Sequence, residues 1–255
     1  MDRSAWAGSA VVLALFLAAW QWGPGMLGMP EFILPPLSRV VEEFGRMAAD
    51  DLWMHTGITA LEIVVGFVLG ALLGVGAGVS LGLSPRAEAM LSPYILALQI
   101  APKVAFAPLF VMWLGYTVYP KILVAVLIVF FPIMVNVLSA IRTVDPDMIN
   151  LVRVLNGRRL QIFRMVEFPS AMPALFSGLR IGSTLAVIGV TVGELVGGNL
   201  GLGFLLVSNE GQGNTAGVFV TIILLTLIGI AAYAAVVWAE QRVLHYLPKA
   251  QHATV

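Results

Sequence analysis

Long apolar stretches, separated by shorter polar connections, run through the whole chain of 255 residues. A helix needs roughly 20 predominantly apolar residues to cross a bilayer, and each stretch has about that length. The predicted membrane spans are residues 5–22, 56–83, 88–113, 118–141, 174–197 and 216–241. This pattern predicts an all-α fold: a polytopic membrane helix bundle of about six transmembrane helices, in a single domain of residues 1–255.

The composition places most of the chain in lipid. Hydrophobic residues make up 59% of the sequence and charged residues 11%, whereas a soluble domain averages about 25% charged residues. An apolar excess of this size does not fit into one globular core. The surroundings of the chain must therefore be apolar as well.

The first apolar stretch has two interpretations, a signal peptide or a retained span. It lacks a small-residue cleavage site, and it ends in Trp20, Gln21 and Trp22, which suit the interface between membrane and water. We therefore expect a retained helix.

The placement of lysine and arginine predicts the orientation, because cytoplasmic connections carry an excess of these residues. If the N-terminus lies inside, most basic residues fall on the cytoplasmic side. The cytoplasmic set is Arg3, Arg86, Arg142, Arg153, Arg158, Arg159, Arg164, Arg242 and Lys249, and the outer set is Arg39, Arg46 and Lys121. The connection 198–215 has neither lysine nor arginine, as an outer loop should. Both termini are therefore predicted to be cytoplasmic.

Residues 23–51 form the first outer connection. The prolines of Leu34-Pro35-Pro36 disfavour helix, and Ser38 is a candidate cap for a short amphipathic helix that follows. Such a helix lies either in the plane of the membrane interface or packed on the spans.

Glycines recur at every fourth position of the second predicted span. They are Gly66, Gly70, Gly74, Gly78 and Gly82. This spacing places them near one helix face, where small residues let a second backbone approach closely. Close packing, within the chain or between chains, is one interpretation, and a moving hinge is the other.

Charged residues at membrane depth are costly, so those inside the spans are candidates for a translocation pathway. Pro102, beside Lys103, interrupts the third span, and broken helices are tolerated where they line a cavity. Glu62 and Glu194 either face the same cavity or pair with Lys103. Alternatively, Glu194 and Arg180 lie near span ends, from which their side chains reach the polar interface.

Residues 145–168 form a long polar segment with hydrophobic periodicity of its own. Asp145 and Pro146 are typical of a helix start, and Asn156-Gly157 of its end. A second short helix is predicted over about 158–168, ended by two prolines, Pro169 and Pro173, before the fifth span.

An apolar knob of Leu151, Val152 and Leu155 lies on the first of these two helices. A knob of this kind suits the docking of a soluble motor protein at the membrane surface. The alternative is an amphipathic loop that lies on lipid headgroups, to which arginines are attracted.

No catalytic or metal-binding constellation emerges from the sequence. Cysteine is absent, the three histidines are far apart, and the glycine-rich stretches do not complete a nucleotide-binding spacing. No serine has a neighbouring histidine that would suggest a nucleophile. We expect no enzyme, no metal or cofactor, and no nucleic-acid partner.

The polar segment resembles the coupling loop of bacterial ATP-binding-cassette (ABC) importer permeases. That loop has Glu-Ala-Ala, a glycine after three further residues, and then Leu-Pro and a second proline about a dozen residues later. Here Asn150-Leu151-Val152 stands in the Glu-Ala-Ala place and Asn156 in the glycine place, and Phe168-Pro169 and Pro173 follow in register.

The resemblance extends over about residues 30–246 and is to the nitrate/sulfonate/taurine-type permeases. It is also carried by Leu34-Pro35-Pro36, Pro102-Lys103, Gly193-Glu194-Leu195 and Gly201-Leu202-Gly203.

This resemblance implies the permease subunit of an ATP-driven importer in the bacterial inner membrane, working by alternating access. The implied partners are two copies of an ATP-binding subunit, a periplasmic or lipid-anchored solute-binding protein, and a second permease in a homodimer within the lipid. The residues implied in ATPase coupling are Asn150, Leu151, Val152, Arg153, Leu155, Asn156, Gly157, Arg158 and Arg159.

Two departures from the family pattern bear on partner contacts and solute. Asn150 replaces the glutamate, and bulkier side chains replace both alanines, so the knob is larger. Many sulfonate-type relatives carry arginine near position 62, whereas relatives for thiamine-precursor pyrimidines or riboflavin carry an acid, as Glu62 does here. The resemblance favours the latter solutes, and sulfonate-, taurine- or nitrate-like solutes are the alternative.

Two other classes of function stay open at the level of the sequence. An ion-gradient-driven secondary carrier often shows internal repeats with paired broken helices, but this chain has one strongly interrupted span and no convincing second copy. The other class is a membrane scaffold that transports nothing.

Overall fold

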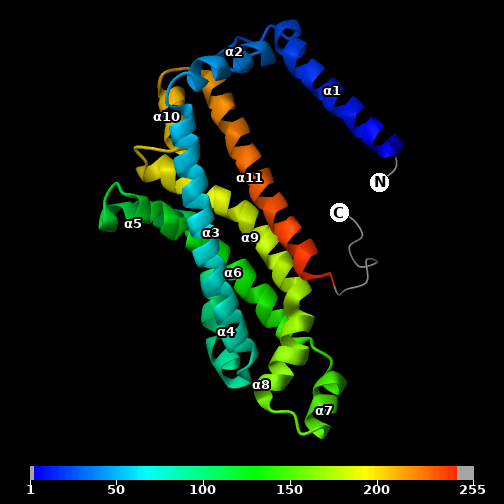
Figure 1. The fold of residues 1–255 in the computed structure, drawn as a ribbon. Helices are drawn as coiled ribbons and strands as arrows, with labels where there is room; N and C mark the ends of the chain where they lie inside the picture. Colours follow the sequence, from blue (N-terminus) through cyan, green and yellow to red (C-terminus); the bar gives the residue numbers. More distant parts are fainter. Residues whose placement is uncertain (1–2, 246–255) are drawn as a thin grey trace. The chain divides into compact units, whose positions relative to one another are not determined.

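The computed structural model describes residues 3–245, and every regular element in this range is a helix (Figure 1). Five helical stretches are long and apolar enough to cross a membrane. They are α1 (Arg3–Met26), α3 (Leu52–Gly82), α6 (Val118–Arg142), α9 (Phe168–Gly197) with the short helices that precede it, and α11 (Thr215–Val243). The all-α prediction of a polytopic bundle is confirmed. Lys249, one of the residues used to predict orientation, lies outside the described residues.

The remaining elements are shorter than a membrane span. They are α2 (Leu37–Ala48), α4 (Pro85–Ile100), the 3₁₀ helix η1 (Lys103–Phe106), α5 (Ala107–Leu114), α7 (Pro146–Val154), α8 (Arg159–Ile162), the π helix η2 (Phe163–Glu167) and α10 (Leu202–Gly211).

The third predicted span, residues 88–113, is not one straight helix. α4 and the η1–α5 pair are bent by 80° at the break between them. A proline disfavours helical backbone at the residue before it, and Ala101, which precedes Pro102, has an extended ψ of 136°. The described residues therefore hold five continuous candidate spans, and a sixth if both arms of this bend form one span.

The chain divides into two compact units. Unit 1 holds residues Met1–Thr59 and Asn199–Thr226, and unit 2 holds Ala60–Gly198 and Leu227–Val255. The boundary passes through α3 and α11. The expectation of one permease domain over residues 1–255 stays a prediction.

In unit 1, side chains of α1 hold the start of α2. Pro36 is the N-cap of α2, so Ser38 lies inside the first turn and is not the cap that the sequence suggested. The Ser38 N–H donates to Gln21 Oε1 at 2.8 Å, and Trp20 Nε1 donates to the Pro35 carbonyl at 3.1 Å. Gln21 thus supplies the acceptor that a capping side chain would otherwise provide.

Also in unit 1, α3 holds the start of α10. The Gly201 N–H donates to His55 Nδ1 at 2.8 Å, and the Leu202 N–H donates to Thr59 Oγ1 at 2.7 Å. These bonds satisfy amide groups that have no partner within a helix. Since Nδ1 accepts, the ring proton of His55 lies on Nε2, which faces Asp51 Oδ2 at 3.0 Å. Gly201 has a φ of 110°, which side chains rarely allow.

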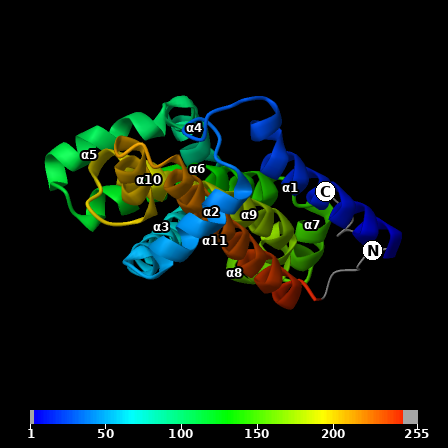
Figure 2. The ribbon, with the colours of Figure 1, turned by 90° about the horizontal axis from the view of Figure 1, so that it is seen from above.

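In unit 2, α6 and α9 are the two most extensively buried helices. α6 runs alongside α9 over much of its length, as both views of the ribbon show (Figures 1 and 2). Its buried residues include Val129, Ile133 and Val137, which form the core with residues of α3 and α9.

The glycine face of α3 packs directly on α6. A Cβ atom on Gly66 would lie 2.6 Å from Ala125 Cβ, and one on Gly74 would lie 2.8 Å from the Phe130 carbonyl oxygen. The other three glycines of this face approach α6 just as closely. The geometry supports the interpretation that the glycines serve close packing within the chain.

α9 approaches the opposite side of the same core through glycines of its own. A Cβ atom on Gly189 would lie 2.6 Å from Ala125 Cα, and one on Gly193 would lie 2.6 Å from Lys121 Cα. Two helices therefore reach the backbone of α6 at distances that any side chain would prevent.

The second short helix of the polar segment does not stop at Pro169 and Pro173. α8, η2 and α9 follow one another without a break from Arg159 to Gly197. Pro169 has no N–H to donate, and the wider π turn lies directly before it, where the helix accommodates that loss. The predicted end of the helix at these prolines is wrong because prolines inside membrane helices are tolerated when neighbouring structure adjusts.

The glycine face yields a prediction with an internal control. Gly74→Ala places a methyl group against a backbone oxygen that cannot move aside, so we expect a loss of about 1–3 kcal/mol of stability. Gly76→Ala, on the same helix with no atom within 4 Å of the new Cβ, should be neutral or stabilising. Thermal unfolding in detergent measures both. Equal melting temperatures for the two variants would contradict the packing role.

Candidate functional site

The helix α7 begins and ends as its sequence predicts. Asp145 is the N-cap and accepts from the Asp147 N–H at 2.9 Å, and Pro146 occupies the first helical position. Asn156 has a φ of 60°, the left-handed conformation that closes a helix. The Gly157 N–H donates to the Val152 carbonyl at 2.9 Å, which completes the closing turn.

Gly157 is required for space and not for a left-handed backbone. A Cβ atom there would lie 2.7 Å from the Val152 carbonyl oxygen. Asn156 supplies the unusual backbone conformation, and Gly157 lets the chain pass the last turn of α7 closely.

The apolar knob on α7 differs in one residue from the predicted one. Leu151 and Leu155 are 59% and 74% exposed, as expected, but Val152 is half-buried because it packs against Gly157. Val154, at 80% exposed, takes its place. We call the exposed set Leu151, Val154 and Leu155 the α7 knob.

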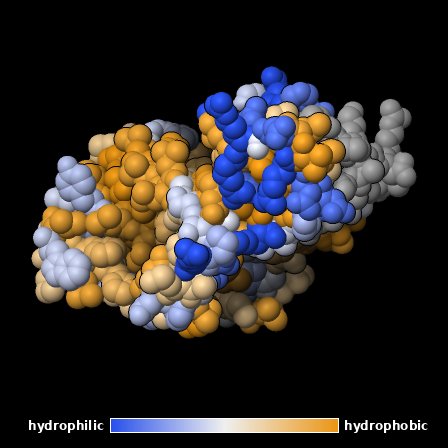
Figure 3. Space-filling model, turned by 90° about the horizontal axis from the view of Figure 1, so that it is seen from below, coloured by the Kyte–Doolittle hydropathy of each residue, from blue (hydrophilic) through white to orange (hydrophobic). Residues whose placement is uncertain are grey.

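Polar side chains surround this knob. Asn150 accepts a hydrogen bond from Arg153 at 3.2 Å, and the Arg158 N–H donates to Gln161 Oε1 at 2.7 Å at the start of α8. Seen from below, hydrophilic side chains gather at the end of unit 2 that α7 and α8 form (Figure 3). The segment thus presents an exposed apolar group within a basic, polar surface.

Arg159 is tied to a buried acid. Its Nη1 lies 3.0 Å from Glu167 Oε1, and the Glu167 side chain is 5% exposed. The second carboxylate oxygen of Glu167 has no hydrogen-bond partner among the described residues. No local pattern in the sequence indicates that this carboxylate is buried.

A buried ion pair joins α3 and α6 in unit 2. Lys121 Nζ lies 2.8 Å from Glu62 Oε1, and the two side chains are 3% and 4% exposed. Glu62 therefore pairs with Lys121 and not with Lys103. The sequence predicted Lys121 only as an outer-side charge. It did not predict the pair, because the two residues are 59 positions apart and no local pattern connects them.

Lys103 and Pro102 lie at the bend between α4 and α5. Lys103 Nζ donates to the Gln99 carbonyl at 2.6 Å and lies 5.0 Å from the centre of the Phe131 ring. Such a position over an aromatic face is favourable for a cation.

The two remaining charges of the spans lie on α9. Glu194 is 1% exposed, and the neighbouring Gly193 packs against the turn of α6 that carries Lys121. Arg180 Nε lies 3.4 Å from Glu240 Oε2 on α11, so it has an acidic partner inside unit 2.

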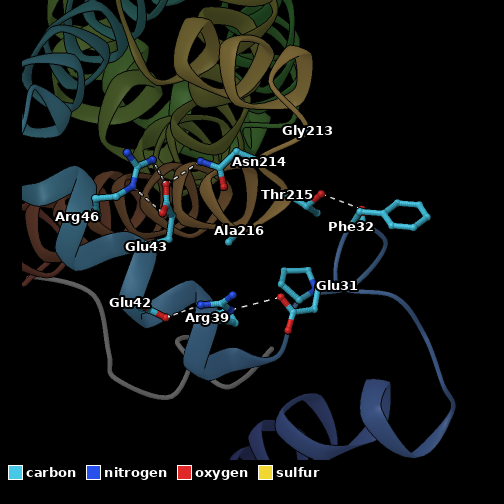
Figure 4. A pocket seen from close by; sticks show the side chains of 11 residues that line it. Glu31, Phe32, Arg39, Glu42, Glu43, Arg46, Gly213, Asn214, Thr215 and Ala216 are labelled. Carbon is cyan, nitrogen blue, oxygen red and sulfur yellow. Dashed lines mark hydrogen bonds and ion pairs between the residues drawn. The ribbon is translucent and has the colours of Figure 1, made fainter.

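A separate charged groove of about 530 Å³ lies in unit 1 (Figure 4). Its walls are α2, the connection before it and the connection between α10 and α11. Arg39 bridges Glu31 at 3.3 Å and Glu42 at 3.0 Å, and Asn214 Nδ2 donates to Glu43 Oε1 at 2.7 Å.

The charge of Glu43 in this groove is stabilised by its hydrogen-bond partners. Hydrogen bonds from the Arg46 guanidinium hold the pKa of Glu43 below its usual value against the opposing effect of burial, and the hydrogen bond from Asn214 adds to this. Glu43 is consequently ionised at neutral pH.

Comparisons with known proteins agree on one family. The model of the family described as "Binding-protein-dependent transport system inner membrane component" matches residues 66–245. The riboflavin transport system permease protein RibX of Chloroflexus aurantiacus is 39% identical over 227 residues, which cover 89% of this chain and 85% of that protein. The formylaminopyrimidine transport permease protein ThiX of Halalkalibacterium halodurans is 32% identical over 235 residues, which cover 92% and 94%.

Among solved structures, a chain of the MetNI methionine ABC transporter in an inward-facing conformation has a similar fold. The TM-score is 0.58 at 20% identity, with 72% of this chain and 94% of that chain covered. At this identity the likeness bears on the fold alone, and it agrees with the helix bundle described above.

The buried ion pair generates a stability prediction. Lys121→Met leaves the Glu62 carboxylate buried without its cationic partner, so we expect a loss of about 3–5 kcal/mol. The double variant Glu62→Leu with Lys121→Met removes both charges and should recover most of that loss. Thermal unfolding in detergent compares the two. A double variant as unstable as the single one would show that the pair is not the source of the effect.

The Glu43 interaction predicts a dependence on pH. Since the pKa of Glu43 is lower in the folded chain than in the unfolded chain, the interaction stabilises unit 1 fully above the unfolded pKa of about 4.3. The stabilisation is lost as the pH falls through the lower, folded pKa. Glu43→Gln should therefore reduce the melting temperature at about pH 7 and have a smaller effect near pH 3. An equal effect at both pH values would contradict this assignment.

Proposed function

Because the chain belongs to the family of binding-protein-dependent transport system inner membrane components, we propose that its α7–α8 segment is the surface through which a separate ATPase drives transport. The chain is the membrane-spanning permease subunit of an ABC importer and not an enzyme. Membership of the family implies an ATP-binding subunit and a solute-binding protein as partners. A gradient-driven carrier and a scaffold are therefore no longer the favoured alternatives.

The observation that carries the coupling proposal is the exposed α7 knob. Leu151, Val154 and Leu155 are each more than half exposed in the most polar part of unit 2. ATP shifts a conformational equilibrium only by as much as it binds the two states differently. A permease driven by a partner's ATP needs a contact that transmits this difference, and a rigidly capped helix with an apolar tip suits that task.

The nine positions from Asn150 to Arg159 that the sequence singled out have distinct roles in this proposal. Leu151 and Leu155 contact the ATPase, and Arg153 and Arg158 lie at the rim of that contact. Val152, Asn156 and Gly157 hold the shape of the turn, Asn150 orients Arg153, and Arg159 connects the start of α8 to Glu167 at the end of η2.

Two copies of this permease form the pathway in our proposal. No described residue of α4 is buried, and its exposed side chains include Met90, Tyr94 and Ile100. An apolar arm of this kind, with Pro102 and Lys103 at its bend, suits coverage by a second copy. Each copy would bind one ATPase subunit.

The orientation follows from the basic residues of α7 and α8, which belong in the cytoplasm by the positive-inside rule. Both termini are then cytoplasmic, and residues 23–51 face outward. We assign the charged groove of α2 to the docking of the solute-binding protein, because ion-paired side chains of both signs give specificity to such contacts.

For the solute, we favour a nitrogen heterocycle. The relatives at 39% and 32% identity are named for riboflavin and formylaminopyrimidine. Glu62 engages Lys121 through one oxygen, and its other oxygen has no hydrogen-bond partner among the described residues, so it is free to accept from a ring N–H when the pathway opens. Glu194 is a second buried acid beside the same helix.

Co-purification of the tagged permease with its ATP-binding subunit tests the coupling proposal. Gly157→Pro removes the N–H that closes the α7 turn and should reduce recovery of the ATPase at least about ten-fold, and Leu155→Asp should do the same by placing a charge in the contact. Gly76→Ala serves as a control for substitution of a glycine elsewhere.

The outcome is read only for variants that remain monodisperse. Leu155 is 74% exposed, so Leu155→Asp should fold even if Gly157→Pro does not. Wild-type recovery of the ATPase with Leu155→Asp would reject α7 as the contact. A wild-type permease that retains no ATPase would reject the coupling proposal altogether.

A further inference from the structure

The π helix η2 lies at the junction between the polar segment and α9. Its five residues, Phe163–Glu167, separate Arg159 at the start of α8 from the long helix that begins at Phe168. Single π turns inside longer helices hold one residue more than an α turn and are frequent at functional sites. Its last residue, Glu167, forms an ion pair with Arg159 at the start of α8, so the pair spans the whole π turn.

The ion pair depends on the π turn. Successive residues of an α-helix are rotated by about 100°, so residues eight apart, such as 159 and 167, lie about 80° from each other around the axis. A π turn absorbs one residue, which leaves a rotation equivalent to seven residues and an offset of only about 20°. Arg159 and Glu167 therefore share a helix face when the turn is π and separate when it is α.

Glu167 has no described hydrogen-bond partner that could take the place of Arg159. Glu167 is 4% exposed, and its second oxygen has no hydrogen-bond partner among the described residues. A buried carboxylate without a partner is costly. The α register separates Glu167 from Arg159, so this cost disfavours the α register. Pro169 favours the π register as well, because an α turn would bring its ring against the Met165 carbonyl.

We propose that η2 is a register switch between the polar segment and α9, held in the π register by the Arg159–Glu167 pair. Conversion of the π turn to an α turn rotates α7 and α8 by about 100° relative to α9 and shifts them by about 1.5 Å. The inference rests on the proposed coupling function, because a docked ATPase supplies the force for the change. Glu167 is a positioning residue, since it is buried and does not contact the partner.

Spin labels on both sides of η2 measure the register directly. The chain contains no cysteine, so Leu160→Cys and Ser170→Cys provide the only labelling sites. Both positions are exposed. In the π register the two labels lie on opposite sides of the helix axis, and in the α register they lie about 80° apart, which gives a shorter distance.

The expected result is one main distance in the complex of permease and ATPase without nucleotide. Glu167→Gln, which keeps the size of the side chain and removes its charge, should raise the population of the shorter distance about five-fold. Arg159→Lys keeps the charge and should resemble the wild type. If Glu167→Gln does not fold, Arg159→Gln, on a half-exposed residue, tests the same bond.

Transport assays in vesicles provide the functional readout. Glu167→Gln should retain the ATPase subunit as the wild type does, while solute transported per ATP hydrolysed falls about five-fold. The register switch is rejected if the label distances are the same in wild type and Glu167→Gln, or if transport per ATP is unchanged. Failure of the wild-type permease to retain an ATPase would instead reject the proposed function, and the label distances would still report whether the pair sets the register.

Discussion

The close approach of α3 and α9 to the backbone of α6 is the constraint on which unit 2 depends. In lipid, apolar side chains gain little from leaving their surroundings, so helices associate through close packing and internal polar contacts. Glycines on α3 and α9 remove the side chains that would hold the three backbones apart. Only at this distance does the Glu62 carboxylate reach Lys121 in a place where neither touches solvent. Packing and charge pairing are thus one arrangement and not two independent features.

The sequence predicted the features that depend on local spacing. Apolar stretches gave the spans of α3, α6 and α11 within a few residues, and the cap residues of α7 were identified individually because Asp145, Pro146 and Asn156 act on their own turns. The glycine face was visible as a repeat of four, although not the helix that it would meet. These are properties of a chain segment and its own backbone.

The sequence did not predict features that depend on distant residues. The pairing of Lys121 was missed because its partner lies on another helix, and the acceptor at the start of α2 is Gln21 on α1, which no pattern near Ser38 indicates. The 80° bend at Pro102 and the continuous helix through Pro169 show the same limit, since proline breaks one helix and not the other. What decides between them is whether neighbouring structure, such as a π turn, accommodates the lost hydrogen bond.

The glycine face has a further consequence for how α3 finds its place on α6. Gly66, Gly70, Gly74, Gly78 and Gly82 repeat every four residues, and so do Ala125, Val129, Ile133, Val137 and Ile141, which they meet. Because both repeats have the same period, a shift of α3 along α6 by four residues, about 6 Å, again places glycines opposite side chains of the α6 repeat. The steric match alone therefore leaves the alignment degenerate. The ion pair of Glu62 and Lys121 does not recur four residues away, so it selects one alignment of α3 on α6. Without this pair, the folded permease would be a mixture of alignments.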